Sequence, residues 1–382
     1  MFVDQGQGAT ASFTRRLAES ATASLAYRFE LNRVQAGDVY FCVNFGVCDA
    51  NTIRAVSSSR RLSPLVFTSQ LGRADDPLSP TRGTVGRLTA EHASRYTLSQ
   101  FRYNRADVEV SHYRPAPRFP RVTLAARVRA GFVQSIGNTA SAGGVGGTGF
   151  DLLHPRTRFY AGGAQSVRGY GENQLGPRVL TLDPNVIRGL AVAGGDSTYN
   201  VDPLNADGDP DGGTAACALA DALSLRECFA SRSAYIGDGS FTPRPLGGSA
   251  LVEANLEARF PLVGNFVGAV FVDAGVLGER SFRNLVSGTS TVTPGFGVRY
   301  RSPVGPVRVD LGIRPTLKEV LPVITQTTDS TGANTLLDLT SGGTCSDAIA
   351  RPYCREYPRD SATGFQKFVR RLVLHLSIGE AF

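Results

Sequence analysis

The chain has 382 residues, with 43 Gly, 21 Phe and 12 Tyr, and only 19% of its residues are charged. This composition favours strands and turns over helices. No stretch approaches the roughly 18 to 20 apolar residues of a membrane-spanning helix, and the mean hydropathy is −0.09, which excludes a helical membrane protein. The net charge is +7, but the arginines are spread through strand-like segments rather than clustered with aromatic residues, so nucleic-acid binding is not expected.

Residues 1–8 contain no basic region followed by an apolar core. No secretory signal peptide is therefore expected in this segment. If the protein is exported, we expect the chain to be a fragment.

Alternation of apolar and polar residues with a period of two runs through the chain and predicts about eleven strands. In 251–260, for example, Glu253, Asn255, Glu257 and Arg259 share one face, and the residues between them are apolar. In chain order, the predicted strands are 9–17, 24–32, 63–72, 83–94, 105–114, 121–132, 251–260, 264–277, 292–301, 307–314 and 371–379.

Short and long connections alternate strictly along these strands. The short ones are 18–22, 73–82, 115–119, 261–263 and 302–305, and the longer ones are 33–62, 95–104, 134–247, 278–291 and 316–367. An up-and-down transmembrane β-barrel produces this pattern, with tight turns at the periplasmic rim and long loops without regular structure outside. A soluble all-β sandwich also alternates along its strands, but it does not require this order of connections.

The six cysteines form three pairs that are close in sequence, and each pair lies in a long connection. The pairs are Cys42 with Cys48, Cys217 with Cys228, and Cys345 with Cys354. Local disulfides in an oxidising compartment are the favoured interpretation. Zinc is disfavoured because the spacings do not match zinc sites and the four histidines lie far from these pairs.

Signals for other chemistry are weak. Asp207, Asp209 and Asp211 alternate like the first ligands of a calcium loop, but the twelfth position is Ala218 instead of Glu, so a solvated acidic loop is favoured. No catalytic motif occurs, and the histidines, which are His92, His112, His154 and His375, are scattered singly. We therefore expect no catalytic residue, no metal and no cofactor, and a protein that is not an enzyme.

Three segments carry a resemblance to a known family. Residues 158–170 read RFYAGGAQSVRGY, residues 268–275 read GAVFVDAG, and residues 297–310 read GVRYRSPVGPVRVD. The first resembles the loop signature of the BamA and TamA-like superfamily of outer-membrane assembly factors, also called the bacterial surface antigen family, and the other two fit the same family. The sequences of these segments resemble TamA more than BamA. The resemblance covers essentially the whole chain, most specifically 156–382.

The resemblance implies that the tip Val167, Arg168, Gly169 and Tyr170 folds back into the barrel lumen. By the family pattern, the partners of Arg168 are Asp273 and Glu257, and alternation places both carboxylates on lumenal faces. A buried arginine is costly unless carboxylates satisfy it, and its planar fork suits bidentate pairing. The alternative is that Arg168 is a solvated loop residue.

The end of the chain resembles the targeting strand of outer-membrane barrels. The residues that carry this resemblance are Leu372, Leu374, Leu376, Ile378, Gly379 and the terminal Phe382. An ordinary closing strand has the same alternation.

The family also implies the domain organisation. Its barrels have sixteen strands and follow periplasmic POTRA domains. We therefore interpret 1–382 as the C-terminal part of such a barrel, with 134–247 as a long lumen-entering loop and without the POTRA domains and first strands. Eleven strands leave two unpaired edges, so an open or imperfectly closed barrel is expected.

The implied function is non-covalent assembly, insertion or translocation of outer-membrane proteins, in which the strand 371–379 offers its edge to a client. The implied partners are outer-membrane lipid, unfolded outer-membrane protein clients, and periplasmic or inner-membrane assembly partners reached through POTRA domains. Alternatives are a two-partner secretion transporter, a passive outer-membrane pore and a structural or adhesive barrel. A soluble all-β protein is the remaining reading.

Overall fold

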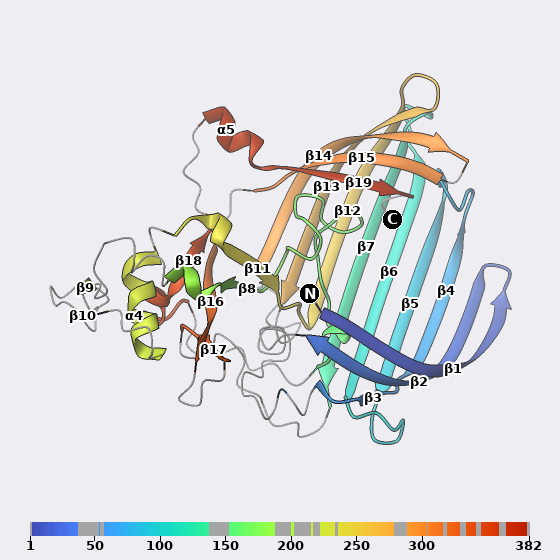
Figure 1. The fold of residues 1–382 in the computed structure, drawn as a ribbon. Coiled ribbons are helices and arrows are strands. Elements are labelled where there is room, and N and C mark those ends of the chain that lie inside the picture. The colour runs from blue at the N-terminus through green and yellow to red at the C-terminus, as the bar shows by residue number, and fades with distance from the viewer. Residues whose placement is uncertain are drawn as a thin grey trace.

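The computed structural model describes residues 2–36, 53, 57–136, 153–187, 200–201, 215–216, 222–233, 236–278, 289–303, 305–315, 319–328, 334–340, 345–358 and 364–379. The dominant element within these ranges is a 12-stranded sheet in which eleven strands follow one another in chain order (Figure 1). These are β1 (Phe2–Ala18), β2 (Ala21–Ala36), β4 (Leu65–Ala74), β5 (Gly83–Ala93), β6 (Tyr103–Pro115), β7 (Thr123–Ser135), β12 (Ala250–Pro261), β13 (Phe266–Gly278), β14 (Thr289–Ser302), β15 (Gly305–Ile313) and β19 (Leu372–Ile378). The twelfth strand, β3 (Arg60–Leu62), pairs with β2.

Every neighbouring pair in this sheet is antiparallel, including β7 with β12, which flank the longest connection. The sheet is open, because within the described residues β1 pairs only with β2 and β19 only with β15. The prediction of an all-β, antiparallel, incompletely closed barrel of about eleven strands is therefore confirmed.

The strand boundaries differ most at the N-terminus. β1 begins at Phe2, whereas alternation predicted a start at residue 9. Residues 2–8 pair in register with 30–36 of β2, as in Phe2↔Ala36 and Gly8↔Glu30. Backbone pairing with an amphipathic neighbour extends this strand even though its own side chains do not alternate.

Burial in the sheet is inverted relative to a soluble protein. On β12, Leu256 is 62% exposed, whereas its neighbour Glu257 is 4% exposed. On β15, Val307 and Val309 are exposed while Arg308 and Asp310 are fully buried. An apolar outer face over a polar inner face is the pattern of a membrane barrel, in which lipid contacts the first and the lumen encloses the second.

The two longest connections contain a second, 5-stranded sheet that alternation did not predict. Its strands are β8 (Arg178–Leu182), β11 (Phe241–Pro245), β16 (Glu319–Thr328), β17 (Asn334–Asp338) and β18 (Cys354–Tyr357). Helix α4 (Ala222–Arg232) packs beside this sheet, since Leu225, Cys228 and Phe229 belong to the same buried cluster as Leu180 and Val323. We call β8, β11, β16, β17, β18 and α4 the outer module.

The outer module corrects the expectation that 134–247 and 316–367 lack regular structure. β8 from the first connection pairs in parallel with β16 from the second, in the register Val323↔Leu180 and Ile324↔Thr181. Arg178 reinforces this link by an ion pair with Glu319 at 2.5 Å. Figure 1 shows the outer module beside one end of the large sheet.

The remaining described elements are short. They are β9 (Asn200–Val201) paired with β10 (Ala215–Ala216), α5 (Gly364–Val369), and the 3-10 helices η2 (Pro155–Thr157), η4 (Asp238–Ser240) and η6 (Arg351–Tyr353). No helix in the described parts of the chain is long and apolar enough to cross a bilayer.

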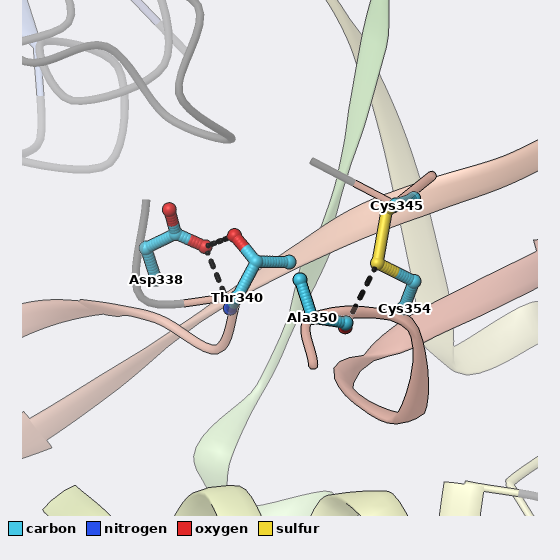
Figure 2. Close-up of a disulfide and its surroundings, with 5 residues drawn as sticks. All are labelled: Asp338, Thr340, Cys345, Ala350 and Cys354. Atoms are coloured by element: carbon cyan, nitrogen blue, oxygen red, sulfur yellow. Dashed lines mark hydrogen bonds between the residues drawn. A yellow bond between two sulfur atoms is a disulfide. The ribbon is translucent and has the colours of Figure 1, made fainter. Parts of the chain in front are cut away.

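A disulfide joins Cys345 to Cys354 in the outer module (Figure 2). Cys354 Sγ also lies 3.4 Å from the carbonyl oxygen of Ala350. The bond fastens the segment before η6 to the start of β18, as the sequence predicted for this pair. Cys228 is disulfide-bonded as well, whereas Cys217, Cys42 and Cys48 lie outside the described residues.

Replacing both Cys345 and Cys354 by Ser is expected to loosen the outer module and leave the large sheet intact. The disulfide spans nine residues, and closing a loop of that size restricts the unfolded chain by about 2 to 3 kcal/mol. Hydrogen exchange should therefore accelerate in 319–328 and 345–358 but not in β12 or β13. Unchanged exchange in β18 would show that the strand pairing alone holds the module.

Candidate functional site: a buried arginine cluster on the inner face

The segment between His154 and Arg178 returns from the long connection to the inner face of the sheet. Its path is fixed by two isolated bridges, Phe159 to Gly248 and Ala161 to Leu175. The side chains of Val167 and Tyr170 at its tip are fully buried, and Tyr170 Oη donates to Thr291 Oγ1 at 3.3 Å. We call residues 154–178 the inner loop.

Arg168 at the tip of the inner loop is 1% exposed and contacts three carboxylates. Its Nε and Nη2 donate to the two carboxylate oxygens of Asp273 at 2.8 and 2.9 Å, and its backbone N–H donates to Asp273 Oδ2 at 3.0 Å. Its Nη1 donates to Glu257 Oε2 at 2.7 Å and lies 3.5 Å from Asp310 Oδ2. The guanidinium also stacks over the ring of Phe271, 3.3 Å from the ring centroid.

Two glycines make room for this arrangement. A Cβ on Gly169 would lie 2.2 Å from Thr293 Cγ2, and one on Gly312 of β15 would lie 2.1 Å from the carbonyl oxygen of Arg168. The backbone of the inner loop therefore approaches the backbone of the sheet more closely than any other residue type would permit.

Further arginines from β12, β14 and β15 balance the charge of Glu257 and Asp310. Glu257 accepts from Arg259 Nε at 2.7 Å and forms an ion pair with Arg299 Nη2 at 2.5 Å. Asp310 accepts from Arg308 Nη1 at 3.0 Å, and Arg308 Nη2 donates to the inner-loop carbonyl of Ala164 at 3.2 Å. Buried charges persist only when paired and hydrogen-bonded, so the inner loop and the sheet face satisfy one another.

A second layer of contacts holds the approach to the tip. Asn255 Nδ2 donates to Asp273 Oδ1 and to the carbonyl of Ser166, both at 2.8 Å. Ser166 Oγ donates to Glu253, whose other oxygen accepts from Arg127 Nη2 at 3.3 Å. Alternate residues of β12 thus supply a continuous polar surface under the inner loop.

The terminal strand takes part as well. His375 Nε2 of β19 lies 2.9 Å from the carbonyl oxygen of Arg168. In the register of β15 with β19, His375 is opposite Asp310. The inner-loop tip therefore contacts side chains of β12, β13, β15 and β19 together.

The family resemblance pairs Arg168 with Asp273 and Glu257, and in the structure Arg168 contacts both carboxylates directly. Neither the resemblance nor the alternation identified the other members of the site, which are Asp310, Arg299, Arg308, Asn255 and His375. The signal for the first four was present, since each shares the polar face of its strand with other charged residues, but alternation does not say which strands meet. Of the proposed targeting strand, Leu374, Leu376 and Ile378 are exposed on the outer face, Leu372 is half-buried, and Phe382 lies outside the described residues.

No group of three metal-binding side chains occurs within the described ranges. The calcium candidates Asp207, Asp209 and Asp211 lie outside them.

His154 at the start of the inner loop predicts a pH dependence. Its ring is 2% exposed and packs edge-on against Phe101, 5.2 Å between centroids. Burial, followed by the positive charges of Arg156 and Arg158, lowers the pKa of His154 from 6.5 to about 3. Because the folded-state pKa is depressed, the stabilisation is fully present above the unfolded pKa and is lost as pH falls from 6.5 towards 3.

We therefore expect the attachment of residues 153–161 to weaken by up to roughly tenfold per pH unit below 6.5. Protease sensitivity of this segment, measured from pH 7 to pH 4, should rise in the native protein and lose much of its pH slope in His154→Gln. His112→Gln, at an exposed histidine of β6, is the matched control. An unaltered slope in His154→Gln would assign the pH dependence to other groups.

A solved structure shares this architecture. The structure is similar to BamA from Haemophilus ducreyi lacking POTRA domains 1-3, with 15% sequence identity and a TM-score of 0.52 over 83% of this chain and 52% of that chain. CdiB from Acinetobacter baumannii matches with 11% identity and a TM-score of 0.41 over 82% of this chain and 39% of that chain. The chain thus spans about half the length of the BamA chain that it matches.

The model of the Omp85 superfamily domain matches residues 3–320, which include ten of the eleven strands in the main sheet path and the whole inner loop. The resemblance found in the sequence is thereby confirmed. The chain belongs to the Omp85 superfamily and is a β-barrel protein of the bacterial outer membrane.

Proposed function

We propose that this protein inserts other β-barrel proteins into the outer membrane, and that its working element is the outward edge of β19. The observation that carries the proposal is the pairing pattern of this strand. Arg314 N–H donates to the Arg371 carbonyl at 2.7 Å, and Gly379 N–H donates to the Pro306 carbonyl at 2.8 Å. In an antiparallel pair the bonded positions alternate, so Val373, His375 and Ser377 also face β15.

The backbone groups of Leu372, Leu374, Leu376 and Ile378 consequently point away from β15. Within the described residues, no strand pairs with this edge. A row of outward N–H and C=O groups is a template on which an extended segment of another chain adds as a further strand. The edge is flanked by apolar side chains that face lipid, which suits a client strand destined for the bilayer.

The inner loop contributes by keeping the terminal strand in place and the lumen filled. His375 links β19 to the Arg168 carbonyl, and Arg168 in turn is held by β12 and β13. A lumen occupied by buried, paired charges favours insertion along the edge over a passive pore. A two-partner secretion transporter, the class with which the sequence also agrees, would use the lumen instead.

The test uses the protein as its gene encodes it, reconstituted in vesicles with an unfolded client barrel. Client folding is followed by its acquired protease resistance, client delivery by its appearance inside the vesicle, and pore activity by ion conductance. Accelerated folding in the bilayer supports insertion. Delivery of the client to the vesicle interior would instead support secretion. Ion conductance without client folding would support a passive pore.

The edge itself is tested by Leu376→Pro, which removes one outward N–H. Proline is tolerated at strand edges when its missing N–H faces away from the ladder. We expect client folding to slow about tenfold or more while the barrel stays folded, because one backbone hydrogen bond to the client is lost and the strand edge is interrupted. Leu376→Val keeps the N–H and is the matched control, and full activity of Leu376→Pro would exclude this edge.

A further inference from the structure

The segment that leads into β19 has an amphipathic surface that the barrel does not cover. Helix α5 (Gly364–Val369) is followed after two residues by β19. Phe365 is 78% exposed, Phe368 44% and Val369 45%. Positions i, i+3 and i+4 of a helix lie on one side, so these three side chains form a single apolar face.

The other side of the segment is basic. Lys367, Arg370 and Arg371 are again spaced i, i+3 and i+4, and residues 364–371 contain no acidic residue. The helical turn continues past the end of α5, because Arg370 N–H donates to the Gln366 carbonyl at 3.1 Å and Arg371 N–H to the Phe368 carbonyl at 3.0 Å. Arg371 is oriented towards the sheet, because its Nε donates to the Arg314 carbonyl at 2.7 Å. Lys367 and Arg370 are exposed.

The place of α5 in the fold decides what covers this surface. β19 crosses the bilayer with Leu374, Leu376 and Ile378 exposed on its lipid face at 60%, 72% and 67%. The polypeptide turns directly from α5 into that strand, and α5 therefore lies at the membrane rim on the side of the long connections. Figure 1 shows α5 at the beginning of β19, apart from the outer module. Aromatic residues gather at this level of a membrane barrel, where the apolar band meets the headgroups.

We propose that α5 is an interfacial anchor that inserts Phe365, Phe368 and Val369 among lipid chains and places Lys367 and Arg370 on the phosphates of anionic lipid headgroups. An apolar face with aromatic residues opposite a Lys and Arg face is the pattern of helices that lie in the interface. The anchor fixes the N-terminal end of β19 by lipid contacts that are independent of its pairing with β15. The inference rests on the membrane location and not on the proposed function.

The chain contains no Trp, so a Trp introduced by substitution is the only one within residues 1–382 of the protein under test. Phe368→Trp introduces a fluorophore in α5, and Ile349→Trp introduces one in the loop between Cys345 and Cys354, where Ile349 is 82% exposed compared with 44% for Phe368. Each variant is reconstituted in vesicles of phosphatidylcholine with or without phosphatidylglycerol, and brominated lipid chains serve as the quencher.

We expect strong quenching of Phe368→Trp and little quenching of Ile349→Trp. Quenching of Phe368→Trp should increase with phosphatidylglycerol, and Lys367→Gln with Arg370→Gln should remove that increase. Near an anionic surface, each basic residue favours binding about fivefold, so the pair is expected to contribute roughly 25-fold to the partition of the helix.

Two results would overturn the inference. Quenching of Phe368→Trp no greater than that of Ile349→Trp would show that α5 is not in the membrane. Equal quenching in both vesicle types would exclude the headgroup phosphates as the partners of Lys367 and Arg370. Inorganic phosphate added to phosphatidylcholine vesicles is the control for free anion, and it should not reproduce the effect of phosphatidylglycerol.

Discussion

Arg168→Ala is expected to destabilise the protein by about 3 to 5 kcal/mol, because it leaves buried carboxylates without their shared cation. Asp273 would lose a bidentate partner and a backbone donor whose position depends on the same side chain, and Glu257 would lose a contact at 2.7 Å. The urea concentration at the unfolding midpoint should fall, and hydrogen exchange in residues 166–170 should accelerate. Client insertion should decrease in parallel while delivery to the membrane is retained.

The matched control is Arg73→Ala. Arg73 also forms an ion pair, with Glu19 at 3.1 Å, but the two side chains are 64% and 85% exposed. An exposed pair contributes about 0 to 1 kcal/mol. If Arg168→Ala and Arg73→Ala unfold at the same denaturant concentration, the buried cluster does not stabilise the barrel.

Arg168→Lys separates charge from geometry. Lysine keeps the positive charge but cannot donate two parallel bonds to Asp273 and a third to Glu257. We expect this variant to recover only part of the loss. Full recovery would mean that a point charge is sufficient and that the planar fork observed here is incidental.

Removing the charge and its partner together gives a second measure of the same contact. Arg168→Met with Asp273→Leu should be less damaging than the sum of the two single changes, because no isolated charge remains between them. Additive effects would show that Arg168 and Asp273 stabilise the fold through different neighbours.

Alternation was sufficient to predict the large sheet because lipid and lumen impose opposite demands on successive residues. Leu256 is 62% exposed and the next residue, Glu257, is 4% exposed, as expected when one faces lipid and the other faces the lumen. The same alternation placed Glu257 and Asp273 on the inner face, and the family resemblance then connected them with Arg168. Alternation and the resemblance were both needed, because alternation identifies the face of a strand but not the contact that a side chain makes on it.

The outer module was not predicted because its strands are short and their partners are distant in sequence. β8 has five residues and pairs in parallel with β16 from another connection. No sequence pattern indicates that Val323 and Leu180 pair. The contact of His375 with Arg168 was missed for a related reason, because its acceptor is a backbone carbonyl and such an acceptor exists at every residue.

Gly312→Val is expected to displace the inner-loop tip without changing any charge. A Cβ at Gly312 would lie 2.1 Å from the Arg168 carbonyl oxygen and 2.5 Å from its carbonyl carbon. These are backbone atoms, and they cannot move without carrying the guanidinium away from Asp273. Overpacking and the partial loss of the ion pairs together predict destabilisation of roughly 3 kcal/mol.

Gly86→Val, on strand β5 of the same sheet, is the control, because a Cβ at Gly86 would lie no closer than 3.9 Å to any neighbouring atom. Gly312→Val should accelerate hydrogen exchange at residues 166–170 and at His375 together, because the loop tip and β19 share the Arg168 carbonyl, whereas Gly86→Val should alter neither. If the loop tip loosens while β19 remains protected, the terminal strand is held by β15 alone. A joint response would show that the inner loop stabilises the position of the strand whose edge we propose to receive the client.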